Sequence, residues 1–205
     1  MKLLNNIDFI LLAPRTLLAL PATAQAIWDA VAGGNSQNAV ESSTGIGTYG
    51  VGQSPARLFD NSPSTAYTSR GNISNSNSPF AGLYTGFYVT VGPCLSVLLG
   101  FVFTTNTVNL ARDPLAITIE ASGGTSNLNL GTSWQVIYSG TSGLSPDPGR
   151  GLPGTFQSIP FIQGYQSYRI LITSKRSNSS NSVSYSKVQL YGRYFTDTTP
   201  ISGKS

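Results

Sequence analysis

The sequence predicts an all-β chain that folds as an antiparallel β-sandwich or jelly roll. At least seven short runs of residues are apolar or alternate between apolar and polar side chains, which is the pattern of buried or half-buried strands. Clusters of Gly, Pro, Asn and Ser separate the runs, and the 22 glycines and 12 prolines favour a turn-rich β protein over a helical one. With 205 residues, 40% of them hydrophobic, the chain can bury one sizeable core.

Residues 1–38 come first and do not follow the strand pattern. Two apolar runs follow Lys2, and the small residues at 22–26 resemble an A-x-A cleavage site, as in a signal peptide. Against this, Asp8 precedes the first run and a Pro-Arg pair at 14–15 interrupts an apolar region that should be continuous. We therefore expect an ordered arm and linker, packed on its own domain or on a neighbour, with a signal segment as the alternative. Neither run reaches the roughly 18 residues of a membrane span.

Residues 39–195 carry the strands, and residues 196–205 read as an exposed tail. A short strand is expected near residues 39–41, inside a Gly- and Ser-rich region that otherwise predicts loops. Sequential strands of a sandwich need not pair, so the strand order does not follow from the sequence. The longer expected strands cover residues 86–91, 95–104, 115–122, 133–139, 155–162, 167–174 and 185–195.

The run at 95–104 differs from the others because it is nearly all apolar and rich in β-forming residues. Such a run predicts a strand buried on both faces. Cys94 lies beside it as the single cysteine of the chain, and we expect a small buried side chain. A later run places Trp134, Val136 and Tyr138 at alternate positions, which predicts one shared face.

The inventory of side chains argues against an enzyme and against nucleic-acid binding. The chain has no histidine, so Ser-His-Asp and Cys-His arrangements are excluded. Asp113 and Glu120 would be more than about 20 Å apart on one strand at about 3.3 Å per residue, too far for a glycosidase pair. Nothing in the sequence supports a pairing of Asp60 with Asp147. The net charge is +4, but the twelve Lys and Arg residues are scattered, whereas a nucleic-acid surface needs clusters.

Three segments, in order, resemble the discoidin-like domains, which include the coagulation factor V/VIII type C domains and the family 32 carbohydrate-binding modules. LFDNSPSTAYTS resembles the family segment F-D-G-x-x-x-T-x-W. PLAITIEAS followed by SWQVIYS resembles I-x-I-x-A-S-x-D-G-x-x-W, with a longer loop between its parts. YRILITS followed by VSYSKVQLYG resembles the two closing strands. The resemblance covers about residues 39–195 and leaves residues 1–38 unexplained.

This resemblance implies a galactose-binding-like jelly-roll sandwich whose loops at one end bind glycans or lipid head groups. The corresponding loops here are residues 45–55, 67–77 and 174–183. We therefore expect a non-catalytic glycan-binding or cell-adhesion module, extracellular or at the cell surface. A sugar site pairs an aromatic platform with a few polar groups. The loops offer seven such candidates: Tyr49, Tyr67, Arg70, Lys175, Arg176, Asn178 and Asn181.

Asp60 has two expected roles. An Asp that precedes Asn-Ser-Pro can accept backbone N–H bonds two residues on and pin a turn. The resemblance implies a structural calcium in many members, for which Asp60 and Thr65 would be ligands. The second acid of the family aligns with Lys187, which cannot bind calcium, so we disfavour calcium and expect an Asp60–Lys187 ion pair in the place of the metal. A three-residue shift of the alignment would leave Lys187 on an exposed face instead.

A structural subunit of an extracellular filament, sheath or particle is the alternative function. The apolar arm motivates it, because an arm could add a strand to the sheet of a neighbour and so drive self-assembly. Asn72 and Asn178 begin N-glycosylation tripeptides, which would be used in a secreted eukaryotic glycoprotein. Glycans on these two residues would make the loops carriers of sugar and not readers of it.

Overall fold

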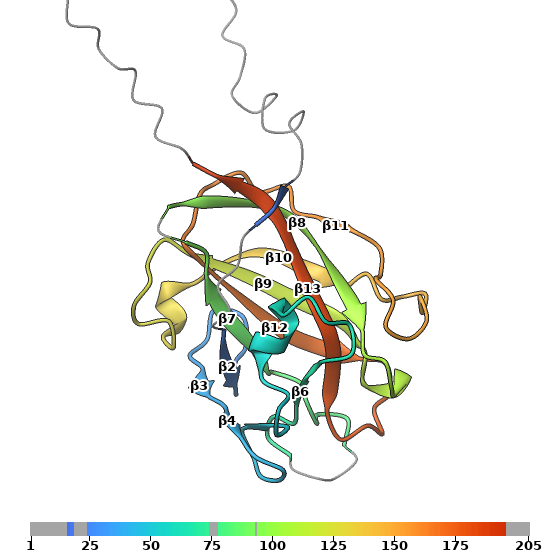
Figure 1. The fold of residues 1–205 in the computed structure, drawn as a ribbon. Helices are drawn as coiled ribbons and strands as arrows, with labels where there is room; N and C mark the ends of the chain where they lie inside the picture. Colours follow the sequence, from blue (N-terminus) through green and yellow to red (C-terminus); the bar gives the residue numbers. More distant parts are fainter. Residues whose placement is uncertain (1–15, 19–23, 74–77, 93, 196–205) are drawn as a thin grey trace, which may run out of the picture.

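Two β-sheets pack face to face in the computed structural model, which describes residues 16–18, 24–73, 78–92 and 94–195 (Figure 1). All strand pairs are antiparallel except β4 with β5, which are parallel. The predicted all-β sandwich is therefore confirmed. No helix among the described residues has the length and the hydrophobicity of a membrane span.

The seven-stranded sheet has the order β11-β8-β13-β6-β5-β4, and β1 pairs with β13 outside this path. Strands β8 and β13 are its longest members and lie side by side at its centre. The strands of this sheet are β1 (Thr16–Leu17), β4 (Val40–Glu41), β5 (Thr48–Tyr49), β6 (Tyr67–Ser69), β8 (Ser96–Thr105), β11 (Gln157–Ser158) and β13 (Val183–Tyr194).

The six-stranded sheet has the order β10-β9-β12-β7-β2-β3. Its strands are β2 (Gln25–Trp28), β3 (Gln37–Asn38), β7 (Gly86–Thr90), β9 (Pro114–Ser122), β10 (Gln135–Thr141) and β12 (Ser167–Lys175). Three short 3₁₀ helices lie in the connections of the two sheets: η1 (Pro55–Phe59), η2 (Leu110–Arg112) and η3 (Gly131–Ser133).

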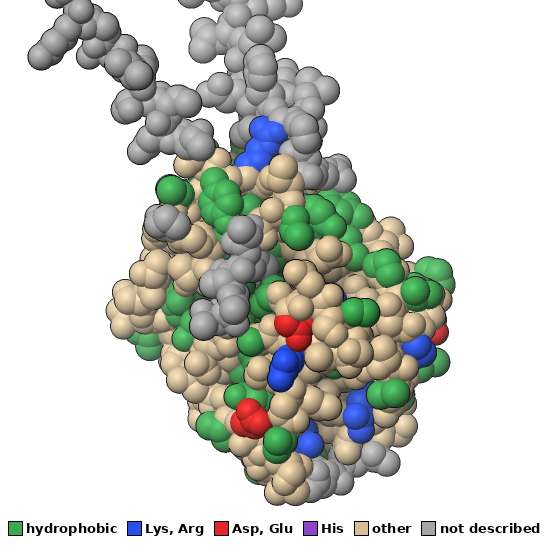
Figure 2. Space-filling model, in the orientation of Figure 1, with side chains coloured by type: hydrophobic (Ala, Val, Ile, Leu, Met, Phe, Trp, Pro, Cys, Tyr) green, Lys and Arg blue, Asp and Glu red, His purple; other side chains and the backbone are tan. Residues whose placement is uncertain are grey.

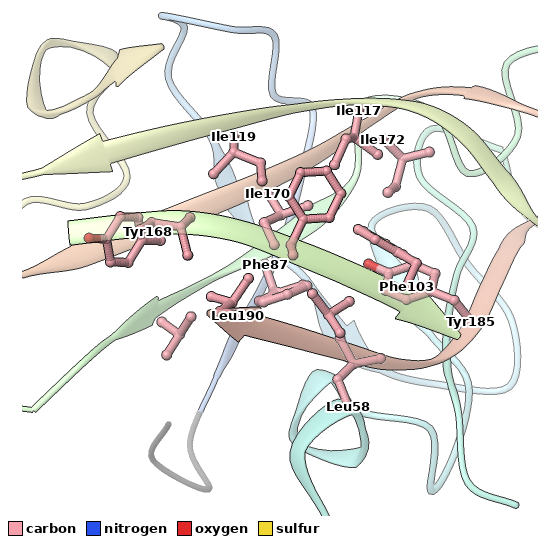
Figure 3. Close-up of a cluster of buried hydrophobic side chains, with 14 of the residues drawn as sticks. Leu58, Phe87, Phe103, Ile117, Ile119, Tyr168, Ile170, Ile172, Tyr185 and Leu190 are labelled. Carbon is pink, nitrogen blue, oxygen red and sulfur yellow. The ribbon is translucent and has the colours of Figure 1, made fainter. Parts of the chain in front are cut away.

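The core between the sheets follows from strand alternation. Every second residue of a strand points to the same face, so an apolar period of two buries one face. In β12, Tyr168, Ile170 and Ile172 are all fully buried. Phe87 of β7 joins them from the neighbouring strand (Figure 3). Across the core, aromatic rings of β6, β8 and β13 pack against these side chains.

Strand β8 is buried on both faces, as its nearly continuous apolar sequence predicts. It lies between β11 and β13, and nine of its ten residues are buried. Cys94, just before the strand, is exposed, so the expectation of a buried cysteine is wrong. The strand begins two residues after the cysteine, at Ser96, so Cys94 lies in the preceding bend and outside the buried part of the run.

The expectation that Trp134, Val136 and Tyr138 share a face also fails. A register shift between Val136 and Tyr138 inserts one residue into the pairing of β10 with β9. Such a bulge turns the following side chains to the opposite face. Tyr138 consequently packs on Phe101 in the core, while Trp134 lies over Arg169 on the outer side of the six-stranded sheet.

The described part of residues 1–38 belongs to the sandwich itself. Strand β1 pairs with β13, and β2 pairs with β7 and with β3. Leu18, Ala26 and Ile27 are all buried. These strands, which precede residue 39, therefore extend the two sheets of their own chain. The cleavage-site pattern falls partly, and the tail at 196–205 falls wholly, outside the described residues.

A buried ion pair crosses the outer face of the six-stranded sheet, where the alternation predicts polar residues at the surface. Glu120 and Arg169 are opposite each other in β9 and β12, and both are 0% exposed. Arg169 Nε donates to Glu120 Oε2 at 2.7 Å, and the turn at Gly33–Gly34 covers the pair through two further hydrogen bonds. The Gly33–Gly34 turn and Trp134 thus cover the pair and shield it from solvent.

Candidate functional site

Three loops gather at the end of the sandwich opposite β1 and the last residues of β13; we call it the loop end (Figure 1). They follow β4, β6 and β12 and span residues 42–47, 70–85 and 176–182. Residues 74–77 inside the second loop are outside the described part of the chain. A backbone bond joins the first two loops, because the Gly47 amide donates to Gly71 O at 2.8 Å. Within the second loop, the Gly82 amide donates to Arg70 O at 2.7 Å.

Arg70 and Asn181 meet at the loop end, and both are partly exposed. Ser69 pairs with Val183 in the sheet, so Arg70 leaves β6 beside the loop that contains Asn181. Arg70 Nη1 donates to Ser42 O at 3.1 Å. Asn181 Oδ1 accepts a hydrogen bond at 3.0 Å from Nη2 of Arg112, a residue that the sequence analysis did not select.

Lys175 lies at the same end but is buried, so it cannot contact a ligand as expected. Its Nζ donates to the carbonyl oxygens of Ser78, Ala81 and Ser180 at 2.6–2.8 Å. Burial lowers the pKa of Lys175 to about 8. The side chain therefore joins the second and third loops from the inside and leaves no donor for a sugar.

Arg176 faces away from the loop surface, which corrects a second expected ligand contact. Its Nε lies 3.2 Å from Oδ2 of Asp113, a carboxylate that is 0% exposed. Arg150 makes two bonds of 2.7 Å to the same carboxylate, and Nη2 of Arg176 also donates to Leu144 O. One buried acid thus holds two arginines and fixes the loop around residue 150 against β9 and β12.

Tyr67 and Tyr49 form part of the interior and are not an exposed aromatic platform. Tyr67 is 0% exposed, and its hydroxyl donates to Gly86 O at 2.9 Å. Burial raises the pKa of this hydroxyl above its usual range. Tyr49 is half-buried, and its ring centre lies 6.3 Å from that of Tyr67. The position that matches the tryptophan of the family segment is therefore filled here by a core tyrosine.

Asn72 and Asn178 are both exposed at the loop end. Asn72 follows Gly71 in the second loop, and Asn178 stands between Ser177 and Ser179, whose hydroxyls are 2.8 Å apart. Both side chains are therefore accessible to solvent, as either a sugar contact or a glycosylation site would require.

Asp60 closes the turn after η1 on the side of the sandwich. Asp60 Oδ1 accepts bonds from the Ser62 amide at 3.0 Å and from the Thr65 hydroxyl at 2.9 Å. Lys187 Nζ lies 2.7 Å from the same oxygen and also donates to Arg57 O at 2.6 Å. Burial alone would raise the pKa of Asp60, but the bonds from Lys187, Ser62 and Thr65 outweigh it and lower the pKa to about 2.

These donors and acceptors do not fit a calcium ion. Calcium needs six to eight oxygen ligands, with carboxylates to balance its charge. Here an ammonium already lies among the oxygens of Arg57, Asp60 and Thr65 and would repel the ion. Within the described residues, no three His, Cys, Asp or Glu side chains come close enough to hold a metal.

A groove of about 480 Å³ lies next to this turn on the outer side of β13. Most of its lining is apolar and comes from β1, from η1 and from Pro63 and Pro153. Its one charged group is Lys187, whose ammonium is already bonded to Asp60. Asn61, Thr104 and Gln189 add uncharged polar groups, so the groove is mixed in character and mainly apolar.

The loop end also exposes apolar side chains that sequence reasoning missed. Phe80 is 58% exposed in the second loop, and Ile46 is 59% exposed in the first. The loop of Phe80 is held by the bond of the Gly82 amide to Arg70 O and by Lys175 beneath it. The expected binding loop ends at residue 77, three residues before Phe80, so Phe80 is not among the expected contacts.

Comparisons with known proteins give a fold but no sequence family. No sequence profile of a known family matches the chain, and no curated protein sequence matches it. Solved structures do match, at low identity. A family 32 carbohydrate-binding module of Clostridium perfringens NanJ, solved with galactose, superposes with a TM-score of 0.53 at 12% identity, over 86% of this chain and 99% of that one.

Two further structures give the same result. Chitosan-binding module 1 of a Paenibacillus chitosanase/glucanase has a TM-score of 0.52 at 18% identity, over 86% of this chain and 99% of that one. The paired family 32 modules of Clostridium perfringens ZmpB have a TM-score of 0.51 at 13% identity, over 86% of this chain and 35% of that one. The chain therefore has the fold of the discoidin-like, family 32 carbohydrate-binding modules.

Proposed function

We propose that this chain is a non-catalytic glycan-binding module and that sugars bind at the loop end. The observation that carries this proposal is the exposed ring of Phe80 on loops that also present Arg70 and Asn181. An aromatic face packs on the C–H groups of a sugar ring, and nearby amide and guanidinium groups bond its hydroxyls. The shared fold with sugar-binding modules supports the same assignment.

The loops are built for recognition and not for reaction. The chain has no histidine, and the buried acids Asp113 and Glu120 are each bonded to arginines. A general acid or base must reach the substrate with a proton to exchange, which these paired carboxylates do not. Glycan binding of this kind suits a module that acts outside the cell or at its surface.

The test is a screen of immobilised glycans followed by Phe80→Ala. We expect this substitution to weaken binding of the selected glycan by about tenfold, which is about 1.4 kcal/mol. Phe195→Ala is the matched control, because Phe195 is 47% exposed and directly follows β13, whose last residues lie at the opposite end of the sandwich. Equal losses for the two variants, or no glycan bound by the wild type, would reject the proposal.

A further inference from the structure

Charge pairing divides the cations of the molecule into two groups. Nine Lys and Arg side chains lie within the described residues, and five of them form ion pairs with acids: Arg57, Arg150, Arg169, Arg176 and Lys187. The remaining four are Arg70, Arg112, Lys175 and Arg193, for which the described part of the chain supplies no acidic partner within 4.0 Å. Few charged side chains of either sign interrupt the face drawn in Figure 2.

Three of the four cations without an acid lie at the loop end. Arg70 follows β6, Arg112 ends η2, and Lys175 ends β12. The third loop links them: Arg112 bonds to Asn181, Lys175 bonds to Ser180 O, and Arg70 follows Ser69, the partner of Val183. Arg193 is near the opposite end of β13, beside Val97.

The two guanidinium groups retain unused donors. A guanidinium has five N–H groups. Within the described residues, Arg70 donates one side-chain hydrogen bond, to Ser42 O, and Arg112 donates one, to Asn181 Oδ1. The Nε of Arg112 is buried and has no partner among the residues that the structure describes. A buried donor that lacks an acceptor costs free energy, which a bound acceptor would recover.

The charges around Arg112 also leave its guanidinium group without an acidic partner among the described side chains. Burial, and then the nearby charge of Arg70, lower the pKa of Arg112 below its ordinary value. Asp113 directly follows Arg112 in the chain, but its buried carboxylate is bonded to Arg150 and Arg176. Glu41, next to Ser42, accepts a bond from the Gly52 amide at 2.8 Å. Within the described residues, neither acid forms an ion pair with Arg70 or Arg112. The sequence of residues 70–85 contains no acid either. The loop end therefore keeps a positive charge at Arg70 and Arg112 that the described part of the chain does not neutralise.

We propose that the loop end binds its glycan through an anionic substituent, a carboxylate or a sulfate ester, held between Arg70 and Arg112. This inference rests on the proposed glycan-binding function and names the chemical class of the ligand. Both substituents present two or three oxygens in a geometry that a guanidinium fork matches. Two arginines beside an exposed Phe80 suit a substituted sugar ring, whereas a nucleic acid needs a longer track of cations.

The experiment compares size-matched neutral, uronate-containing and sulfated oligosaccharides by calorimetry against the full chain. We expect the wild type to bind an anionic series at least about tenfold more tightly than its neutral counterpart. Arg70→Gln and Arg112→Gln should abolish this preference while weaker binding of the neutral sugar persists. Arg193→Gln is the matched control, because it removes the same charge at the other end. The uronate and sulfate series show which substituent is preferred.

The outcomes separate this inference from the proposed function. Tight binding of neutral sugars that neither arginine substitution changes would overturn the anionic ligand and leave the glycan site intact. If no sugar of any series binds, the proposed function fails and this inference fails with it. Equal losses for Arg193→Gln, or equal binding of single-stranded DNA, would show a general polyanion effect and overturn the inference. Arg112→Lys keeps the charge but loses the planar fork, so it is the conservative control for a folding defect. The melting temperature of every variant checks that it is folded.

Discussion

Lys187 on the side of the sandwich and Arg112 at the loop end are both partly buried cations, and they differ in what surrounds them. Lys187 is held by a carboxylate, a carbonyl and a hydroxyl. Arg112 has one amide oxygen and a neighbouring positive charge. Burying a charge without a partner costs free energy, so the contrast assigns stability to the first site and supports the proposal that the second binds a ligand.

The Glu120–Arg169 pair is the extreme case of the first kind. Both side chains are fully buried, and the Trp134 ring centre lies 4.9 Å from the guanidinium carbon. A charge in such a place cannot gain or lose a partner without disturbing the sheet. It holds the Gly33–Gly34 turn on β9 and β12, which is how part of the N-terminal segment becomes integral to the sandwich.

The comparison of paired and unpaired cations predicts the largest loss of unfolding free energy at Arg169. Arg169→Met leaves Glu120 buried without a counter-charge, so we expect a loss of about 3–5 kcal/mol of unfolding free energy. Arg70→Met removes a partly exposed cation that has no acidic partner, and its effect should stay within about 0.5 kcal/mol. Urea denaturation of the two variants measures both values. Equal destabilisation would contradict the division of the cations into paired and available groups.

A second prediction converts the Asp60 turn into a metal site. Lys187→Glu replaces the ammonium with a carboxylate among the oxygens of Arg57, Asp60 and Thr65, which are hard ligands of the kind that calcium prefers. We expect the variant to be less stable than the wild type in chelator. Calcium at a hundredfold excess over its Kd should then restore about 2.7 kcal/mol.

The measurement is the melting temperature with calcium and with chelator. The wild type and Lys187→Met should show no shift, since neither has a second carboxylate at the turn. A calcium-dependent rise in the wild type would show that a metal can displace the ammonium, and would remove the contrast with the loop end.

The sequence predicts the sandwich well because strand periodicity is a local signal. Each apolar run from residue 86 onward lies on or overlaps a strand, from Phe87 to Leu190. The bulge in β10 was not predictable from alternation, because one inserted residue leaves the composition of the run unchanged. Strands β2 and β3 were missed because their few residues show no clear period of two.

The loop end was predicted less well, since polarity in a loop does not tell where a side chain points. Lys175 and Arg176 look like surface cations but bond to carbonyls and to buried Asp113. The position of Arg112 at the loop end follows from the alternating direction of the strands. Alternate connections of antiparallel strands lie at the same end, so the loop after β8 belongs with those after β6 and β12.

The smallest predicted effect is the pH dependence of the Asp60 turn. The folded-state pKa of Asp60 is about 2, below its ordinary value of 3.8. A lowered folded pKa contributes stability that is present above pH 4 and is lost as the pH falls toward 2. Because the pair is partly exposed, we expect this contribution to be only about 1 kcal/mol. Asp60→Asn should therefore cost that much at pH 6 and almost nothing at pH 2.

A double-mutant cycle with Lys187→Met assigns the effect to the ion pair. If Lys187 supplies most of the stabilisation, Asp60→Asn should cost clearly less in the Lys187→Met background, and the slope between pH 4 and 2 should flatten. An unchanged cost would mean that the Ser62 amide and the Thr65 hydroxyl hold the carboxylate by themselves. Lys187 would then resemble Arg70 and Arg112, a cation that the protein leaves available, and the contrast between the two regions would have to rest on Arg169 alone.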